Sequence, residues 1–416
     1  MAGTAAAVTA ARNGADVLLV EQGTALGGLG TAGGITSLIS WAPAFGGFGL
    51  EMYNRLAAEG GAAPYSSHAD KPYDGEYMKR VLDGLVGENC ADMLLYAKVT
   101  DISIDGGRLA GIELCGGEGK FFVTGKYFID CTGDAALAFM AGEPCEPLGD
   151  TQAPTLMCRY TGVNWDEYQK FLARYGGDNV PMIREILPKA VAAGDVRTAD
   201  FHHPGAFRIN NVLTLINVGH VYGADCLSPR GLTEATVEGR RLAAEYLGFY
   251  KKYIKGFENA YLVNTACTLG IRETRRLSGR YMLTFEDKAG YKKFDDTVMR
   301  FEGGGESDLH ASSASEEAYN AYYTLFTSEQ PRADDWASLP YRCLLPQRAG
   351  NLFVAGRCIS AERKVQGRLR TMGNCLMMGQ AAGTAAAICL KENIASDKIN
   401  INKLQDTLLR QGVKNK

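Results

Sequence analysis

The sequence lacks a strong charge of either sign and lacks long apolar runs. Its 416 residues carry a formal net charge of −3, which gives no electrostatic reason to expect nucleic acid or an anionic membrane as a partner. No stretch reaches the roughly 18 uninterrupted apolar residues of a membrane-spanning helix. The alanine-rich N-terminus has no basic region and no long apolar segment, so it does not resemble a signal peptide. We therefore expect a cytoplasmic globular protein.

The sequence also lacks close cysteine pairs. Its 11 cysteines are scattered, and none of them forms a C-x-x-C pair. Structural zinc sites and cubane iron–sulfur clusters usually need such pairs. We therefore expect buried, reduced thiols and no metal site.

The sequence also lacks the opening part of a nucleotide-binding unit at the start of the chain. Five alanines between positions 5 and 11 predict a helix of small residues that ends at Asn13-Gly14. Residues 17–20 form an apolar run typical of a parallel strand buried on both faces. Glu21 then stands at the carboxyl end of that strand, where an acid can bind ribose hydroxyls. The strand and the first two glycines that should open such a unit are not present before Gly3, the position of the third glycine.

Glycine-rich and strand-forming segments follow in an order that favours an α/β fold. Residues 23–49 combine many glycines with apolar side chains, which is typical of an ordered loop against a flat ligand. Residues 93–129 predict a three-stranded meander, with a hairpin turn at Asp105-Gly106-Gly107. The segment 127–134, YFIDCTGD, predicts a strand that ends at a ligand-contacting turn.

Composition changes in the middle of the chain and then changes back. Residues 146–340 contain most of the aromatic residues, and they lack glycine-rich fingerprints. A long amphipathic helix is predicted over residues 233–254, with Thr233 as its N-cap. From residue 351 the chain is again rich in glycine and alanine, as in the first segment. We predict a discontinuous domain of residues 1–145 and 341–416, with a substrate or cap domain of residues 146–340 inserted into it.

Five segments together resemble a known family, the FAD-dependent oxidoreductases with two dinucleotide-binding folds. The closest likeness is to the bacterial group similar to the flavin subunit of heterodisulfide reductase. The segments are AARNGADVLLVEQGTALGGLGTAG, FIDCTGDAALA, GIRETRRLSGRYMLT, NLFVAGRCISA and MGQAAGTAAA. The resemblance covers nearly the whole chain. It implies a Rossmann-like FAD-binding domain, made of a parallel sheet and a meander, with an inserted α+β substrate or cap domain.

The resemblance also implies which residues hold FAD. Gly3 would lie near the pyrophosphate, Glu21 would bind the adenosine ribose, and Val99 would touch the adenine through its backbone. The remaining residues would line the path to the flavin or hold its ribityl and ring end; they are Gly27, Gly28, Thr31, Thr132, Gly133, Asp134, Gly356, Arg357, Gly379, Gln380 and Ala381. A helix beginning near Gly379 would point its free N–H groups at the flavin.

Candidates for the chemistry come from residue types that clamp substrates or transfer protons. Arg272 is the preferred clamp for a carboxylate, with structural ion pairing as the alternative. His310 can transfer protons near neutral pH, with a hydrogen-bonded structural role as the alternative. Arg342 is a further substrate contact. Weaker candidates are the pair His202-His203, Arg370, and a redox thiol at Cys375.

Three functions remain open at the level of sequence. The first is an enzyme that transfers hydride between flavin and a small polar organic substrate, either sugar-like or a carboxylate. The second is an electron-transfer subunit that passes electrons to an electron-carrier protein. The third is a non-catalytic homologue, suggested by the absence of the first strand and of two glycines. A short start of this kind is expected to weaken FAD binding, because the missing strand would be central to the sheet.

Overall fold

The computed structural model describes residues 1–40, 43–65, 70–89, 91–146, 149, 151–202, 205–305, 308–327 and 335–415. His203, one of the sequence candidates, lies outside the described residues. Within the described part, none of the helices combines the length and the apolar character needed to cross a membrane.

The parallel strands that the structure describes form two separate pairs. β1 (Leu18–Val20) pairs with β4 (Asp92–Leu94), and β8 (Phe128–Asp130) pairs with β17 (Leu352–Val354). The prediction that β1 is buried on both faces is wrong, because Leu18 is 38% exposed and its two neighbours in the strand are only partly buried. The physical reason is that β1 pairs with β4 on one side only, among the residues described here.

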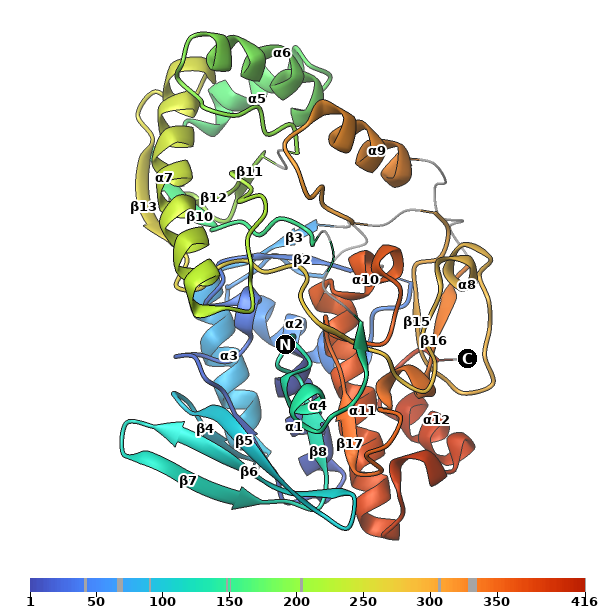
Figure 1. Cartoon of the computed structure of the whole chain (residues 1–416). Coiled ribbons are helices and arrows are strands. Elements are labelled where there is room, and N and C mark those ends of the chain that lie inside the picture. Colours follow the sequence, from blue (N-terminus) through green and yellow to red (C-terminus); the bar gives the residue numbers. More distant parts are fainter. Residues whose placement is uncertain are drawn as a thin grey trace.

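The predicted meander is confirmed. β5 (Lys98–Asp105), β6 (Arg108–Gly116) and β7 (Gly119–Thr124) form an antiparallel sheet in chain order. Gly106 and Gly107 both have positive φ, +53° and +76°, as a two-residue hairpin turn requires. Figure 1 shows the meander as a layer at the lower edge of the molecule, beside β4 and β8.

Two helices from opposite ends of the chain pack directly on each other. They are α1 (Ala2–Arg12) and α11 (Met372–Glu392). A Cβ on Gly379 would lie 2.1 Å from the carbonyl oxygen of Ala2, and a Cβ on Gly383 would lie 2.2 Å from that of Ala6. Glycines at these positions therefore let the two backbones approach closely. The helices run side by side through the middle of the molecule (Figure 1).

Helices and strands from several parts of the chain surround this helix pair. They are η1 (Gly28–Gly30), β2 (Ser37–Ile39), α2 (Gly47–Ala58), β3 (Asp70–Pro72), α3 (Gly75–Glu88), α4 (Ala136–Met140), β9 (Cys145–Glu146), β14 (Arg276–Leu277), α8 (Phe285–Ala289), β15 (Thr297–Phe301), β16 (Ala337–Pro340), η2 (Tyr341–Leu344), α10 (Arg363–Leu369), η3 (Ser396–Lys398) and α12 (Ile401–Arg410).

A second hydrophobic core forms the upper part of the molecule in Figure 1. Its elements are β10 (Cys158–Thr161), α5 (Trp165–Ala173), α6 (Asn179–Ala192), β11 (Gly205–Arg208), β12 (Thr214–Asn217), α7 (Pro229–Tyr253) and β13 (Tyr261–Thr265), with α9 (Glu316–Thr327) beside them. The long helix α7 begins four residues before Thr233, so the predicted N-cap is wrong. Ser228 is the cap, and its hydroxyl accepts the N–H of Gly231 at 3.1 Å. Pro229 at the first helical position explains the earlier start.

The second core covers a shorter part of the sequence than the predicted inserted domain. Among the described residues, the buried members of the second core lie between Cys158 and Ala260, whereas Leu283, Val298, Phe301 and Leu339 lie in the first core. These four residues contribute to the core that contains α1 and α11. The division at residues 146 and 340 stays a prediction.

Candidate functional site

The turn after β8 is held by a buried carboxylate. Asp130 Oδ1 accepts two hydrogen bonds from Thr132, one from its backbone N–H at 3.0 Å and one from its hydroxyl at 2.7 Å. Asp130 Oδ2 accepts the N–H of Ala138 at 3.1 Å. Gly133 has a φ of +80°, in the left-handed region that favours glycine. The predicted strand and turn at YFIDCTGD are therefore present, and Asp130 fixes the turn.

The turn meets the loop after β17 through an ion pair. Arg357 Nη2 lies 2.7 Å from Asp134 Oδ1, and the Thr274 hydroxyl donates to the same oxygen at 2.6 Å. A Cβ on Gly133 would lie 2.6 Å from Arg357 Cζ, so glycine makes room for the guanidinium. The carboxyl ends of β8 and β17 thus present one charged cluster, as expected for adjacent parallel strands.

The residues predicted near the adenosine and along the path to the flavin lie at the end of β1 and in the next loop. Glu21 Oε1 accepts the N–H of Gly23 at 2.7 Å, which shapes the loop. Gly27 and Gly28 have φ values of +93° and +55°, and open space surrounds the position of a Cβ on Gly28. The Thr31 hydroxyl donates to the Leu26 carbonyl and closes this loop.

Two other predicted cofactor contacts, Gly3 and Val99, lie on α1 and β5. Gly3 lies in the first turn of α1, and a Cβ there would be 3.4 Å from Cys131 Cβ and 3.6 Å from a methyl group of Leu19. Helix α1 therefore passes close to both strand pairs. Val99 is paired with Leu114 in the meander.

The predicted helix start near Gly379 is wrong. Helix α11 begins at Met372, with Thr371 before it, so its free N–H groups lie about two turns earlier. Gly379 packs against α1, and the Gln380 side chain accepts the N–H of Phe48 at 2.9 Å. Ala381 is fully buried. Helical periodicity alone does not mark the start here, because the apolar pattern continues from Met372.

Three histidines from separate parts of the chain meet in a buried polar cluster. His202, His220 and His310 are all buried, and one ring nitrogen of each lies within 4.8 Å of the others. His220 Nε2 lies 2.8 Å from His310 Nδ1, and the rings of His202 and His310 stack at 3.9 Å between centroids. We call these residues the histidine cluster.

Two carboxylates flank the histidine cluster. His220 Nδ1 lies 2.9 Å from Asp200 Oδ2, and the Tyr222 hydroxyl donates to Asp200 Oδ1 at 2.8 Å. On the other side, His310 Nε2 lies 3.4 Å from Asp308 Oδ1, and Arg370 Nη2 lies 3.2 Å from Asp308 Oδ2.

The protonation of the cluster follows from burial and charge. Burial and the nearby Arg272 guanidinium lower the pKa of His310 well below its usual value, and burial and His220 do the same for His202. Although burial alone would raise the pKa of Asp308, Arg370 and His310 hold it well below its usual value. The histidines are therefore neutral and Asp308 is ionised at neutral pH.

Amide side chains connect the histidine cluster with the loop after β17. Gln152 Oε1 accepts the backbone N–H of His310 at 3.1 Å, and its Nε2 donates to Gln366 Oε1 at 3.0 Å. Gln366 Nε2 in turn donates to the carbonyls of Arg272 at 3.0 Å and of Arg357 at 3.1 Å. The polar network is thus continuous from the ends of β8 and β17 to the histidines.

The structure brings only two of the three predicted catalytic residues together. Arg272 is buried near His310, with Nη1 donating to the Ala153 carbonyl at 2.7 Å and to the Thr155 hydroxyl at 2.9 Å. Burial and the nearby Arg370 lower the pKa of Arg272 to about 9.

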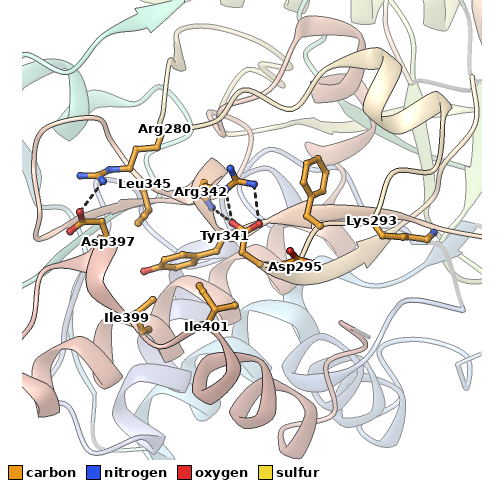
Figure 2. A pocket seen from close by; sticks show the side chains of 11 residues that line it. Arg280, Lys293, Asp295, Tyr341, Arg342, Leu345, Asp397, Ile399 and Ile401 are labelled. Atoms are coloured by element: carbon orange, nitrogen blue, oxygen red, sulfur yellow. Dashed lines mark hydrogen bonds and ion pairs between the residues drawn. The ribbon is translucent and has the colours of Figure 1, made fainter.

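Arg342 instead lines a separate pocket of about 580 Å³ (Figure 2). Its Nε lies 2.9 Å from Asp296 Oδ2. The other residues that line this pocket include Arg280, Lys293 and Asp397. The geometry does not support a common role for Arg342 and His310, and a catalytic role for Arg342 stays a prediction.

Sequence reasoning missed several members of the network, among them Asp200, His220, Gln152 and Gln366. No local pattern marks them, because His220 and His310 are 90 residues apart and their contact depends on tertiary packing. Cys375, a weak candidate for a redox thiol, is buried, and burial raises the pKa of its thiol to about 11.

The cluster at the ends of β8 and β17 fits an anionic, nucleotide-like cofactor such as FAD. Arg357 Nε is buried and has no hydrogen-bond partner among the residues that the structure describes, so a ligand oxygen would satisfy it. The left-handed Gly28, with no atom within 4 Å of the place that a Cβ would take, provides backbone that a ligand can approach. The individual contacts predicted for FAD stay predictions.

Comparisons with solved structures concern the fold of the chain. Among solved structures, the chain is similar to a geranylgeranyl bacteriochlorophyll reductase-like protein from Thermoplasma acidophilum, with 11% identity and a TM-score of 0.50 over 99% of this chain and 81% of that one. A weaker likeness is to p-nitrophenol 4-monooxygenase from Pseudomonas putida, with 10% identity and a TM-score of 0.47 over 98% and 80% of the two chains. At such identities the likeness concerns the fold alone.

No curated protein matches the sequence significantly. A family model described as FAD dependent oxidoreductase, however, matches residues 1–408. This match spans nearly the whole chain, and it agrees with the α/β fold and with the cofactor inferred from the residues. The chain therefore belongs to the FAD-dependent oxidoreductase family.

Proposed function

We propose that this protein transfers hydride between FAD and a small polar organic substrate that carries a carboxylate or several oxygen atoms. One observation carries the proposal: the buried polar network is continuous from the strand ends, where FAD would bind, to the histidine cluster. A flavin enzyme needs such a neighbouring site to position a substrate and handle its proton.

Arg370 and Arg272 provide the positive charge for this substrate. Arg370 Nε is buried and has no hydrogen-bond partner among the described residues. Its Nη2 already contacts Asp308 and, at 3.2 Å, Gln152 Oε1, so the guanidinium is held in place for a further acceptor. A carboxylate or hydroxyl oxygen of the substrate is the acceptor that we infer.

The histidine cluster provides the proton transfer. Because its pKa is lowered, His310 is neutral and can accept a proton from a substrate hydroxyl when hydride leaves the adjacent carbon. The contact of 2.8 Å between His310 Nδ1 and His220 Nε2 allows the proton to be shared between the two rings. FAD, when bound, supplies the two-electron chemistry.

The proposal is tested by spectroscopy followed by turnover. The purified chain is expected to show the absorption bands of oxidised flavin, and reduction of the flavin by a panel of hydroxy acids and sugar acids is followed in the absence of oxygen. Arg370→Leu is expected to raise KM for the reducing substrate by about 10–100-fold, since it removes a charge-assisted hydrogen bond. Arg208→Leu, which changes an arginine outside the network, is the matched control.

His310→Ala separates proton transfer from cofactor binding. It is expected to leave the flavin bound and to lower kcat by about 10²–10⁴-fold. Unchanged turnover in His310→Ala would show that the proton assignment is wrong. A flavin that no small molecule reduces, but that a protein electron carrier does reduce, would favour the electron-transfer function instead.

A further inference from the structure

We infer that Tyr96 belongs to the FAD site, where its ring stacks on the adenine of the cofactor. The inference goes beyond the proposed hydride transfer, because it concerns the half of FAD that takes no part in that reaction. Tyr96 lies two residues after β4, in the loop that leads to β5. Three properties of this residue carry the inference: its place in the fold, its backbone conformation and its exposure.

Tyr96 lies at the carboxyl end of a parallel strand pair, beside Glu21. β1 and β4 end in register at Val20 and Leu94, and the N–H of Glu21 donates to the Leu94 carbonyl at 2.8 Å. Just beyond these strand ends, the N–H of Tyr96 donates to the Gly23 carbonyl at 3.1 Å. Ligands of open α/β sheets bind outside the carboxyl ends of the strands. The backbone of Tyr96 is therefore part of the same strand-end region as Glu21, the predicted ribose ligand.

The backbone of Tyr96 is strained. Its φ is +58°, in the left-handed region, where a bulky side chain is an outlier. Two hydrogen bonds hold the loop in this conformation, the one from Tyr96 to Gly23 and one from the N–H of Ala97 to the Glu21 carbonyl at 3.2 Å. They explain the conformation but not the tyrosine, since glycine or asparagine would adopt it at lower cost. Strain of this kind is concentrated at active sites and ligand clamps.

The other left-handed residues that are not glycine show where such conformations occur in this fold. Among the described residues they are Ala135, Tyr291 and Asn393. Asn393 directly follows α11, a position where asparagine can end a helix. Ala135 lies in the turn after β8, next to Asp134 of the charged cluster. Tyr96 and Ala135 thus place one left-handed residue at the carboxyl end of each parallel strand pair, the region that fits the cofactor.

The ring of Tyr96 is exposed to solvent. The residue is 68% exposed, and its side chain makes no hydrogen bond or ring contact with the residues that the structure describes. The ring therefore gains no packing within the chain that would offset the strain of its backbone. An aromatic ring at a nucleotide site is a stacking platform for a base. Adenine is the planar group of FAD that belongs here, because an acid at the position of Glu21 binds the adjoining ribose.

Titration of the full chain, freed of bound flavin, with FAD and with ADP tests the inference. ADP carries the adenine and the pyrophosphate of FAD, so its binding does not depend on flavin chemistry. Tyr96→Asn removes the ring at a residue type that tolerates the left-handed backbone. By calorimetry, it is expected to raise Kd for both ligands by about 5–150-fold. Tyr96→Phe keeps the ring and is expected to bind both ligands as the wild type does.

The stability of the ligand-free chain shows whether the loop tolerates the change. Because asparagine relieves the strained backbone, Tyr96→Asn is expected to melt about 1–2 °C higher than the wild type in the absence of ligand. A variant that binds weakly and also melts lower would assign the loss of affinity to a damaged loop and overturn the inference. Tyr261→Asn is the matched control, because Tyr261 is 65% exposed on β13, and it should keep the affinity for both ligands.

The remaining outcomes separate the adenine contact from the proposed function. An equal Kd for ADP in the wild type and in Tyr96→Asn, or a folded wild-type chain that binds neither ligand, would overturn the adenine contact. Equal weakening in Tyr96→Phe and Tyr96→Asn would assign the effect to the hydroxyl and overturn the stacking. A chain that shows the expected ADP affinities, with a flavin that no substrate reduces, would support the adenine contact and contradict only the proposed hydride transfer.

Discussion

The contact between α1 and α11 gives a prediction whose magnitude follows from the structure. In Gly379→Ala, the new Cβ would be placed 2.1 Å from the Ala2 carbonyl oxygen, more than 1 Å inside any normal contact. The obstacle is backbone, so no side-chain rotation relieves it, and the two helices must separate. Overpacking of this kind costs about 1–3 kcal/mol, and we expect the upper end of the range.

A gain in helix propensity partly offsets this cost. Alanine is better than glycine in a helix interior by about 1 kcal/mol, so the net loss for Gly379→Ala is about 2 kcal/mol. With an unfolding entropy of about 2.1 cal/mol/K per residue, a chain of 416 residues loses about 2 °C in Tm for that amount. Differential scanning calorimetry measures this shift.

Gly248→Ala is the matched control. Gly248 lies inside α7, and no atom lies within 4 Å of the place that a Cβ would take, so only the propensity gain applies. We expect its Tm to rise by about 1 °C. If Gly379→Ala raises Tm as much as Gly248→Ala does, the close approach of α1 and α11 is refuted, and with it the reason for glycine at this position.

Three further predictions concern titration, thiol reactivity and a buried ion-pair network. Folding lowers the pKa values of His202 and His310, so the unfolded chain binds more protons than the folded chain below pH 6.5. The free energy of unfolding should therefore fall by about 2 kcal/mol per histidine between pH 7 and pH 5. A Tm that does not change over this interval would contradict their burial as neutral rings. Iodoacetamide should alkylate the exposed Cys267 well before Cys375, whose thiol pKa is raised to about 11, and peptide mapping of a time course checks the order. Glu273→Gln should destabilise the chain by about 3 kcal/mol, because two arginines lose a carboxylate that is only 2% exposed, and chemical denaturation measures the loss.

Local patterns in the sequence predicted much of the fold because short-range physics controls those elements. Asp105-Gly106-Gly107 specifies a hairpin through positive φ, and the meander followed as predicted. The segment at Asp130 to Asp134 predicted a strand and turn at the carboxyl end of a parallel strand, which the structure confirms. The predicted start of α7 was wrong because two nearby residues can both cap the helix. Ser228, followed by Pro229, is the N-cap in place of Thr233.

The candidate site was predicted less completely, because its residues converge only after folding. Arg272 and His310 were selected from residue type, and both belong to the buried network, whereas Arg342 occupies another pocket. His220, which contacts His310 directly, gave no local signal.

The sequence by itself determined the α/β class and the meander, since periodicity, turn residues and glycine patterns are local properties of a chain. Five of its segments together resembled a flavin-dependent family. Tertiary structure alone decided which charged and aromatic side chains share a buried region. Asp200, His220 and His310 lie in one network although more than a hundred residues separate the first from the last. Gly379 of α11 lies against the backbone of α1. Such contacts depend on how distant elements pack, and a short pattern carries no information about that packing.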